Sequence, residues 1–194
     1  MKRLYYILPL LVVAVLGGFF AVGLTLNSKD LPSVLINQKM PPLDLAPIKG
    51  SDRGLKTEDL LGTVSLVNVF GSWCIACKIE HPFLMKIKAQ NRVPLHGIDW
   101  REKTPDDGPN WLARKGNPYI LVGDDPVSKA AIALGVTGAP ETFIIDYKGV
   151  IRYKVIGPMT EKIWQETVGP IINELRRVQA EELAGKNKQK GGTS

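Results

Sequence analysis

An unbroken apolar run leads directly into a pair of cysteines two residues apart, and this junction limits the folds open to the chain. Residues 64–70 have the near-continuous apolar pattern of a strand that is buried on both faces of a sheet. The chain continues with Gly71-Ser72-Trp73-Cys74-Ile75-Ala76-Cys77, and a helix is expected to about Gln90. The sequence therefore predicts a strand-to-helix loop whose two cysteines can cycle between a dithiol and a disulfide.

The expected helix gives the two cysteines different roles. Cys74 falls at the helix N-terminus, where unpaired backbone N–H groups and the positive end of the helix dipole stabilise a thiolate. A stabilised thiolate is the better nucleophile and leaving group. Cys77 lies one turn further on, close enough to attack a mixed disulfide formed at Cys74. Redox chemistry at this pair is the resulting hypothesis.

Two structural roles for the cysteines are the alternatives. A disulfide across four residues stabilises a fold little, because the entropy of closing a loop grows with its length. Half of a zinc site would need two further ligands, and His81 and His96 are the only histidines of the chain. The chain has no other cysteines, so both alternatives are weaker than the redox hypothesis.

The N-terminus predicts export and membrane attachment. Residues 1–3 are Met-Lys-Arg, and no charged residue occurs over 4–26. That stretch is long enough to cross a hydrocarbon core of about 30 Å as a helix. The positive flank favours a cytoplasmic N-terminus and an exported body. A cleaved signal peptide is the alternative, but its apolar region is shorter and ends at an Ala-x-Ala type of site, which is missing here.

The rest of the chain is expected to form one domain. A spacer over 27–42 would be followed by the domain at 43–184 and a polar, disordered tail at 185–194. The formal net charge is +6, but acidic residues are interspersed through the body, and this pattern indicates a solvated surface rather than a nucleic-acid site. Since no cysteines remain to form structural disulfides, the stability of the fold must come from its hydrophobic core.

The expected elements indicate an α/β fold. Strands are expected over 64–70, 93–100, 119–122, 142–146 and 150–155, and helices over 74–90, 109–115, 126–135 and 160–184, with interruptions at Pro82 and at Gly169-Pro170. A β-α-β crossover followed by a hairpin and a final helix gives a mixed sheet with helices on both faces.

The cysteine pair on this framework resembles the thioredoxin fold, over about residues 43–177. A second mark of the resemblance is Gly138-Ala139-Pro140-Glu141-Thr142-Phe143, just before an expected strand. Thioredoxin-like proteins carry a cis-proline at this place, facing the two cysteines across the substrate groove. The resemblance therefore implies that Pro140 is cis, whereas sequence alone gives an X–Pro bond only a modest cis frequency.

Several stretches narrow the resemblance to the DsbE/CcmG family, the membrane-tethered thiol:disulfide oxidoreductases of cytochrome c maturation. They are the expected anchor, the segment 68–82, Gly116-Asn117-Pro118-Tyr119 and the segment 135–146. The resemblance implies no cofactor and no metal. It makes Cys74 the attacking cysteine and Cys77 the resolving one. It also implies that Trp73 shields the pair, that the acids Glu80 and Glu141 lie near it, and that Ala139 and Pro140 line the groove.

The chain departs from thioredoxins at two places. Its middle dipeptide is Ile75-Ala76, where this family and most thioredoxins usually have a proline, so the start of the helix is expected to differ. Asn68 stands where thioredoxins bury an aspartate that takes the proton of the resolving thiol. The DsbE/CcmG family shares this departure from thioredoxins. An asparagine cannot act as that base. Glu80, one helical turn from Cys77, is the expected replacement.

The resemblance also implies partners and a location. The protein would sit in the bacterial inner membrane by a single span, with its catalytic domain in the periplasm. A transmembrane thiol relay of the DsbD or CcdA kind would supply electrons. The substrate would be the Cys-x-x-Cys-His disulfide of apocytochrome c, or a haem-lyase-associated thiol partner that presents it. A copper chaperone on the same fold and a non-catalytic tethered binding module are the alternatives. Copper proteins of this fold typically separate their cysteines by three residues, whereas two separate them here.

Overall fold

The computed structural model describes residues 2–25 and 35–191, and the chain divides into two compact units, Met1–Pro32 and Ser33–Ser194. In the first unit, the α-helix α1 (Lys2–Thr25) covers most of the expected anchor, with Pro9 inside it. Among the described residues, no helix combines the length and the apolarity that crossing a membrane requires. Residue 26 of the expected anchor and residues 27–34 of the spacer lie outside the described part.

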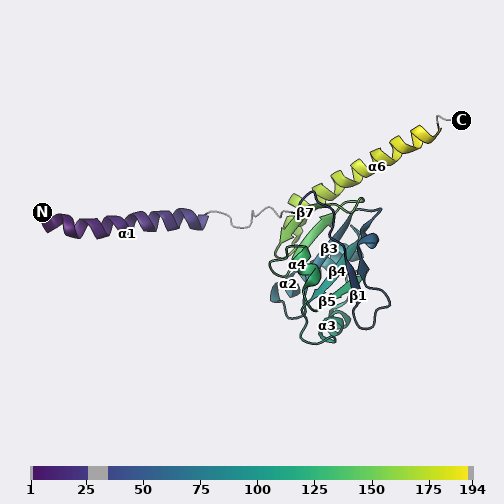
Figure 1. Ribbon diagram of the computed structural model, residues 1–194, viewed down its shortest axis with the longest axis horizontal. Coiled ribbons are helices and arrows are strands. Elements are labelled where there is room, and N and C mark those ends of the chain that lie inside the picture. The colour runs from purple at the N-terminus through teal and green to yellow at the C-terminus, as the bar shows by residue number, and fades with distance from the viewer. Residues whose placement is uncertain (1, 26–34, 192–194) are drawn as a thin grey trace. The chain divides into compact units, whose positions relative to one another are not determined.

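The second unit is built on a mixed sheet with the strand order β2-β1-β5-β4-β3-β6-β7 (Figure 1). The three central strands β5, β4 and β3 are parallel, and β1, β2, β6 and β7 add to the two sides as antiparallel strands. The bounds are β1 (Asp44–Pro47), β2 (Leu55–Lys56), β3 (Ser65–Phe70), β4 (Leu95–Trp100), β5 (Val122–Asp125), β6 (Glu141–Ile145) and β7 (Ile151–Ile156). Every residue of β3 is buried, as expected for a central strand.

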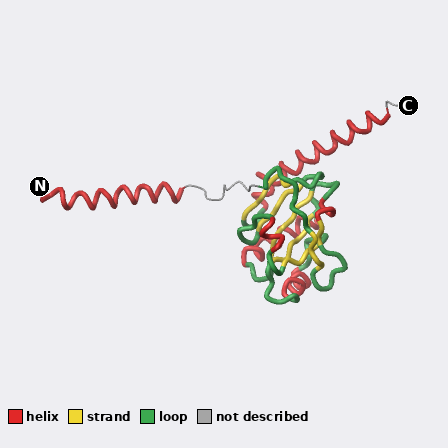
Figure 2. Tube along the Cα trace, in the orientation of Figure 1, coloured by secondary structure: helices red, strands yellow, loops and turns green. Residues whose placement is uncertain are grey.

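Helices cover both faces of this sheet, and the strands lie at the centre of the domain (Figure 2). One apolar cluster packs α2 (Ile75–Ala89), α3 (Asp107–Lys115) and α6 (Gly169–Gly191) against alternate residues such as Leu66 and Ile144. The other packs the 3₁₀ turn η1 (Thr57–Leu60) and α4 (Lys129–Ala133) against Val67 and Phe143. Side chains of a strand alternate between faces, so each strand serves both clusters. The thioredoxin-like α/β architecture is confirmed.

A strand and a helix differ clearly from their expected bounds. The strand expected at 119–122 lies at Val122–Asp125 instead, because Asn117 Oδ1 accepts the N–H of Tyr119 at 2.9 Å and holds a turn there. The helix expected at 126–135 is confined to α4. Asp125 belongs to β5, and its carboxylate caps α4 by accepting the N–H groups of Ala130 and Ala131 at 3.2 and 2.9 Å.

The last helix is interrupted, but by a π turn just before the expected break. Thr160 caps α5 (Glu161–Ile163) through its side chain, and the π turn η2 (Trp164–Val168) follows before α6 begins at Gly169. The structure gives helix up to Gly191, where the sequence predicts a disordered tail. Residues 192–194 of that tail lie outside the described part.

Candidate active site

The two cysteines form a disulfide at the junction of β3 and α2. Cys74 is the N-cap of α2, and its Sγ accepts the backbone N–H of Cys77 at 3.0 Å. The helix thus begins directly after Cys74, although no proline occupies Ile75 or Ala76. After reduction, this N–H would point at the Cys74 sulfur and favour its thiolate. The expected difference between the two cysteines therefore has a structural basis.

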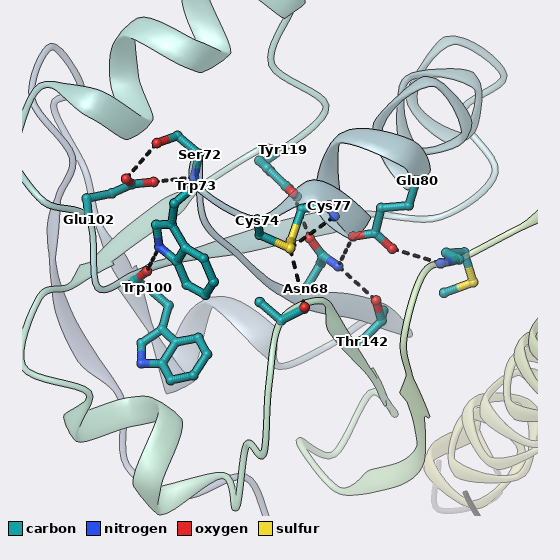
Figure 3. The surroundings of a disulfide bond; sticks show 12 residues. Asn68, Ser72, Trp73, Cys74, Cys77, Glu80, Trp100, Glu102, Tyr119 and Thr142 are labelled. Carbon is teal, nitrogen blue, oxygen red and sulfur yellow. Dashed lines mark hydrogen bonds between the residues drawn. A yellow bond between two sulfur atoms is a disulfide. The ribbon is translucent and has the colours of Figure 1, made fainter.

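The segment before β6 lies against Cys74. The Ala139–Pro140 peptide bond is cis, which confirms the isomer implied by the resemblance. The carbonyl oxygen of Ala139 lies 3.3 Å from Cys74 Sγ (Figure 3). Ala139 and Pro140 therefore lie where a partner polypeptide would have to approach the attacking sulfur.

A buried polar network lies beside the disulfide on the same face of the sheet (Figure 3). Asn68 Nδ2 donates to Glu80 Oε1 and to Thr142 Oγ1, both at 2.9 Å. Asn68 Oδ1 accepts the hydroxyl of Tyr119 at 2.6 Å, and Glu80 Oε2 accepts the N–H of Met159 at 2.8 Å. The amide of Asn68 thereby uses both of its N–H donors, and its oxygen accepts one hydrogen bond.

Burial raises the pKa of Glu80 to about 7, even though its hydrogen bonds from Met159 and Asn68 favour the charged form and pull the pKa down. Glu80 can therefore exchange a proton near neutral pH. Burial also lifts the pKa of Tyr119 well above its ordinary value, so its hydroxyl stays a donor to Asn68. Asn68 does not act as a base here but orients the carboxylate that can, as the expectation for Glu80 requires.

Glu141 does not join this network. Its carboxylate accepts the N–H and hydroxyl of Thr137 at 3.0 and 2.6 Å and lies 2.7 Å from Lys154 Nζ, with both ion-pair side chains buried. The reason is strand alternation. Thr142 faces Asn68, so its neighbour Glu141 faces the opposite side of the sheet. The acidic group expected near the cysteines at this position is instead part of a buried ion pair behind β6.

The outer wall of the site is formed by two tryptophans. The Nε1–H of Trp73 donates to the carbonyl oxygen of Trp100 at 3.1 Å, and their rings meet edge to face at 5.8 Å. Trp73 remains 42% exposed beside Cys74. A Cβ on Gly71 would lie 2.5 Å from Trp73 Nε1, so the glycine allows the indole to fold back over the loop. Trp73 thus lies where the resemblance places a shielding residue.

Glu102 is a site residue that the sequence did not reveal. Its carboxylate accepts both the backbone N–H of Ser72 and the Ser72 hydroxyl, the latter at 2.7 Å (Figure 3). This contact ties the loop before Cys74 to the segment that follows β4. Tyr119, Thr142 and Met159 were also missed as members of the buried network. For Tyr119 the only signal was its place in the segment 116–119.

The histidines hold no metal-binding geometry with the cysteines in the described residues. His81 Nε2 lies 3.1 Å from the carbonyl oxygen of Gly116, and its ring packs against Trp111 at 4.5 Å. These contacts make His81 a packing residue of α2. Burial lowers the pKa of His81 and of His96, so both are neutral at pH 7.

Comparisons with known proteins agree with this geometry. The Redoxin family model matches residues 36–168. The thiol:disulfide interchange protein DsbE of Pseudomonas aeruginosa is 38% identical, covering 90% of this chain and 96% of that protein. DsbE of Allochromatium vinosum is 39% identical (86% and 91% covered), and HelX of Rhodobacter capsulatus, also a thiol:disulfide interchange protein, is 36% identical (85% and 93%). This chain belongs to the DsbE family.

Solved structures show the same fold at lower identity. A secreted thiol-disulfide isomerase from Corynebacterium glutamicum has a TM-score of 0.61 at 20% identity, covering 76% of this chain and 96% of that one. StoA from Bacillus subtilis has a TM-score of 0.55 at 20% identity, covering 70% and 98%. As a DsbE-family protein with a Cys-x-x-Cys disulfide at the start of α2, the chain is a thiol:disulfide oxidoreductase.

The raised pKa of Glu80 predicts how stability depends on pH. Between the ordinary pKa of 4.5 and the folded value of about 7, the folded protein binds a proton that the unfolded chain has lost. The free energy of unfolding should therefore fall as the pH rises through this window, by up to about 3 kcal/mol. In Glu80→Gln the fall should be smaller by this amount, and the part that remains is expected from Asp99, whose pKa burial raises to about 8. Urea unfolding of the oxidised protein at a series of pH values measures the difference.

The exposed Glu58 provides the matched control, since Glu58→Gln removes a carboxylate outside the core and should keep the wild-type pH curve. The comparison concerns the slope of each curve, because the substitution also changes a hydrogen bond. A Glu80→Gln protein whose curve keeps the wild-type slope between pH 4.5 and 7 would show that Glu80 does not cause this part of the fall.

The second prediction concerns Glu102. Glu102→Ala removes the acceptor of two Ser72 hydrogen bonds and should lower the free energy of unfolding by about 1–3 kcal/mol. Hydrogen exchange at the Ser72 amide should become markedly faster. Glu102→Gln keeps one acceptor oxygen, so its stability and its exchange rate at Ser72 should lie between those of the wild type and of Glu102→Ala. Unchanged exchange at Ser72 in Glu102→Ala would mean that the loop is held by other contacts.

Proposed function

We propose that this protein reduces disulfides during cytochrome c maturation, acting on the Cys-x-x-Cys-His disulfide of apocytochrome c or of a haem-lyase-associated partner that presents it. The observation that carries the proposal is the buried Glu80, which Asn68 orients beside the Cys74–Cys77 pair and whose pKa is raised to about 7. Such a group supports proton release from a resolving thiol at neutral pH. Haem attachment requires both substrate cysteines as thiols, which gives the reduction its purpose.

The first step is attack by the reduced protein. The Cys74 thiolate, favoured by the Cys77 N–H and the start of α2, attacks one sulfur of the substrate disulfide. The substrate S–S bond breaks, and its other sulfur leaves as a thiolate that takes a proton. A mixed disulfide now joins Cys74 to the substrate, whose backbone lies against Ala139.

The second step is resolution. Glu80 in its charged form takes the proton of the Cys77 thiol, and the Cys77 thiolate attacks Cys74 Sγ. The mixed disulfide breaks, the second substrate thiolate leaves and is protonated, and the Cys74–Cys77 disulfide forms. Two electrons have passed to the substrate. A donor dithiol then returns the pair to the reduced state by the reverse exchange, and a transmembrane relay of the DsbD or CcdA kind is the donor we propose.

Two cysteine variants test this mechanism on oxidised apocytochrome c. Cys77→Ser should trap a mixed disulfide through Cys74, because the resolving thiol is gone. Cys74→Ser should lose exchange altogether. Mass spectrometry under non-reducing conditions detects the adduct, and thiol titration of apocytochrome c measures turnover by the wild type. Reduction by Cys74→Ser at the wild-type rate would refute the roles of the two cysteines, and failure of the wild type to produce substrate thiols would refute the substrate.

We further propose that residues 4–26 form a retained anchor in the bacterial inner membrane, with the catalytic domain in the periplasm. The uncharged stretch over 4–26 and the basic residues Lys2 and Arg3 support this orientation. An anchor would hold the disulfide near a membrane relay that renews its electrons.

The anchor predicts the behaviour of the protein in cells. Membranes washed with carbonate should retain the full-length chain, because a spanning helix is not released by high pH. N-terminal sequencing should find the start Met1-Lys2-Arg3. A chain lacking residues 1–26 and fused to a cleavable export signal is the control and should appear in the soluble periplasmic fraction. Recovery of a soluble native form that begins near Asn27 would establish cleavage instead.

A further inference from the structure

A pocket is lined in part by Trp73, the residue directly before the attacking cysteine. Its volume is about 340 Å³, and Trp73, Trp100, Arg101 and Lys103 line it. Trp73 directly precedes Cys74 in the chain, and Figure 3 shows its indole beside the disulfide, with the Trp100 indole next to that of Trp73. A polypeptide joined to Cys74 would therefore lie next to this pocket.

The backbone at the end of β4 directs the acidic Glu102 away from the pocket and the basic Arg101 and Lys103 toward it. Arg101 has a φ of 52°, in the left-handed region that side chains rarely adopt. After this turn, Glu102 faces inward and binds Ser72, whereas Arg101 and Lys103 on either side of it are exposed and line the pocket. Backbone strain of this kind is common at ligand-binding sites.

Neither pocket cation has a counter-ion among the residues that the structure describes. Within residues 2–25 and 35–191, neither Arg101 nor Lys103 has a carboxylate within ion-pair distance. The adjacent acid is Glu102, whose carboxylate already accepts hydrogen bonds from Ser72. Burial, aided by Glu102, raises the pKa of Asp99 to about 8, so this second nearby acid is mostly neutral at pH 7. The pocket therefore presents a positive charge that the neighbouring acids only partly offset.

We propose that this pocket is a subsite for an acidic side chain of the polypeptide that exchanges its disulfide with Cys74. The carboxylate would pair with Arg101 and Lys103, and its methylene groups would pack on Trp73 and Trp100. The partner's residue would lie two or three positions from its attacked cysteine, since an extended chain covers roughly 7–10 Å in that distance. The inference rests on the proposed function only in that the partner is a polypeptide.

The test uses the reduced full-length protein and synthetic peptides with an internal Cys-x-x-Cys disulfide. The peptides carry Glu or its neutral isostere Gln two or three residues from the first cysteine, and His or Ala after the second. The wild type should reduce the Glu peptides about 5–10-fold faster than the Gln peptides at low salt, and the difference should shrink as salt is added. In Arg101→Gln/Lys103→Gln the Glu and Gln peptides should react equally fast.

Two controls separate the subsite from general charge and from chemistry. Lys39→Gln/Lys162→Gln removes the same charge from exposed lysines outside the pocket and should keep the preference for Glu. All three proteins should reduce the neutral 2-hydroxyethyl disulfide at the same rate.

The peptide series distinguishes the two proposals. Equal rates for Glu and Gln peptides in the wild type, or a preference that survives in Arg101→Gln/Lys103→Gln, would overturn the subsite. A preference for Glu that is the same with His or Ala after the second cysteine supports the subsite and counts only against recognition of the haem-attachment motif.

Discussion

The buried carboxylate of Glu80 is the interaction on which the site depends. It joins three parts of the fold, because Glu80 lies on α2, Asn68 on β3 and the Met159 N–H in the segment before α5. Tyr119 and Thr142 extend the network by binding Asn68. A charge in the interior is costly unless it is hydrogen-bonded, and here the bonds fix its position without fully offsetting the cost. The remaining cost is what makes the group exchange a proton near neutral pH.

The same arrangement separates the roles of the two cysteines. The start of α2 directs an N–H at Cys74 Sγ, which favours negative charge on the attacking sulfur. Cys77 is almost fully buried and has the carboxylate one helical turn away, so negative charge there is disfavoured until Glu80 accepts a proton. Attack and resolution thus follow in order because Cys74 lies at the start of α2, whereas Cys77 lies within its first turn, near Glu80.

Sequence predicted the parts of the site that follow from local order. The start of the helix determines the places of Cys74 and Cys77, and one helical turn determines that of Glu80. The cis isomer at Pro140 was implied by the resemblance of the segment before β6 to thioredoxin-like proteins. Long-range packing decided the rest. The resemblance implied that Glu141 lies near the cysteines, but side chains alternate between the two faces of β6 and Glu141 faces Lys154 instead. Glu102 was missed because its role depends on a loop 30 residues away in the chain. The sequence around position 102 contains no pattern that predicts the contact with Ser72.

The missing proline between the cysteines changes what holds the loop. A proline there would restrict the backbone before the helix by its ring, whereas Ile75 and Ala76 leave the backbone freer. The structure supplies the restraint from outside the helix. Glu102 binds Ser72, and Trp73 is fixed by the carbonyl oxygen of Trp100, so both residues that precede Cys74 are tied to the end of β4. The position of the attacking sulfur therefore depends on the end of β4, which also forms the pocket lined by Arg101 and Lys103. A partner bound in that pocket would contact the loop that carries Cys74.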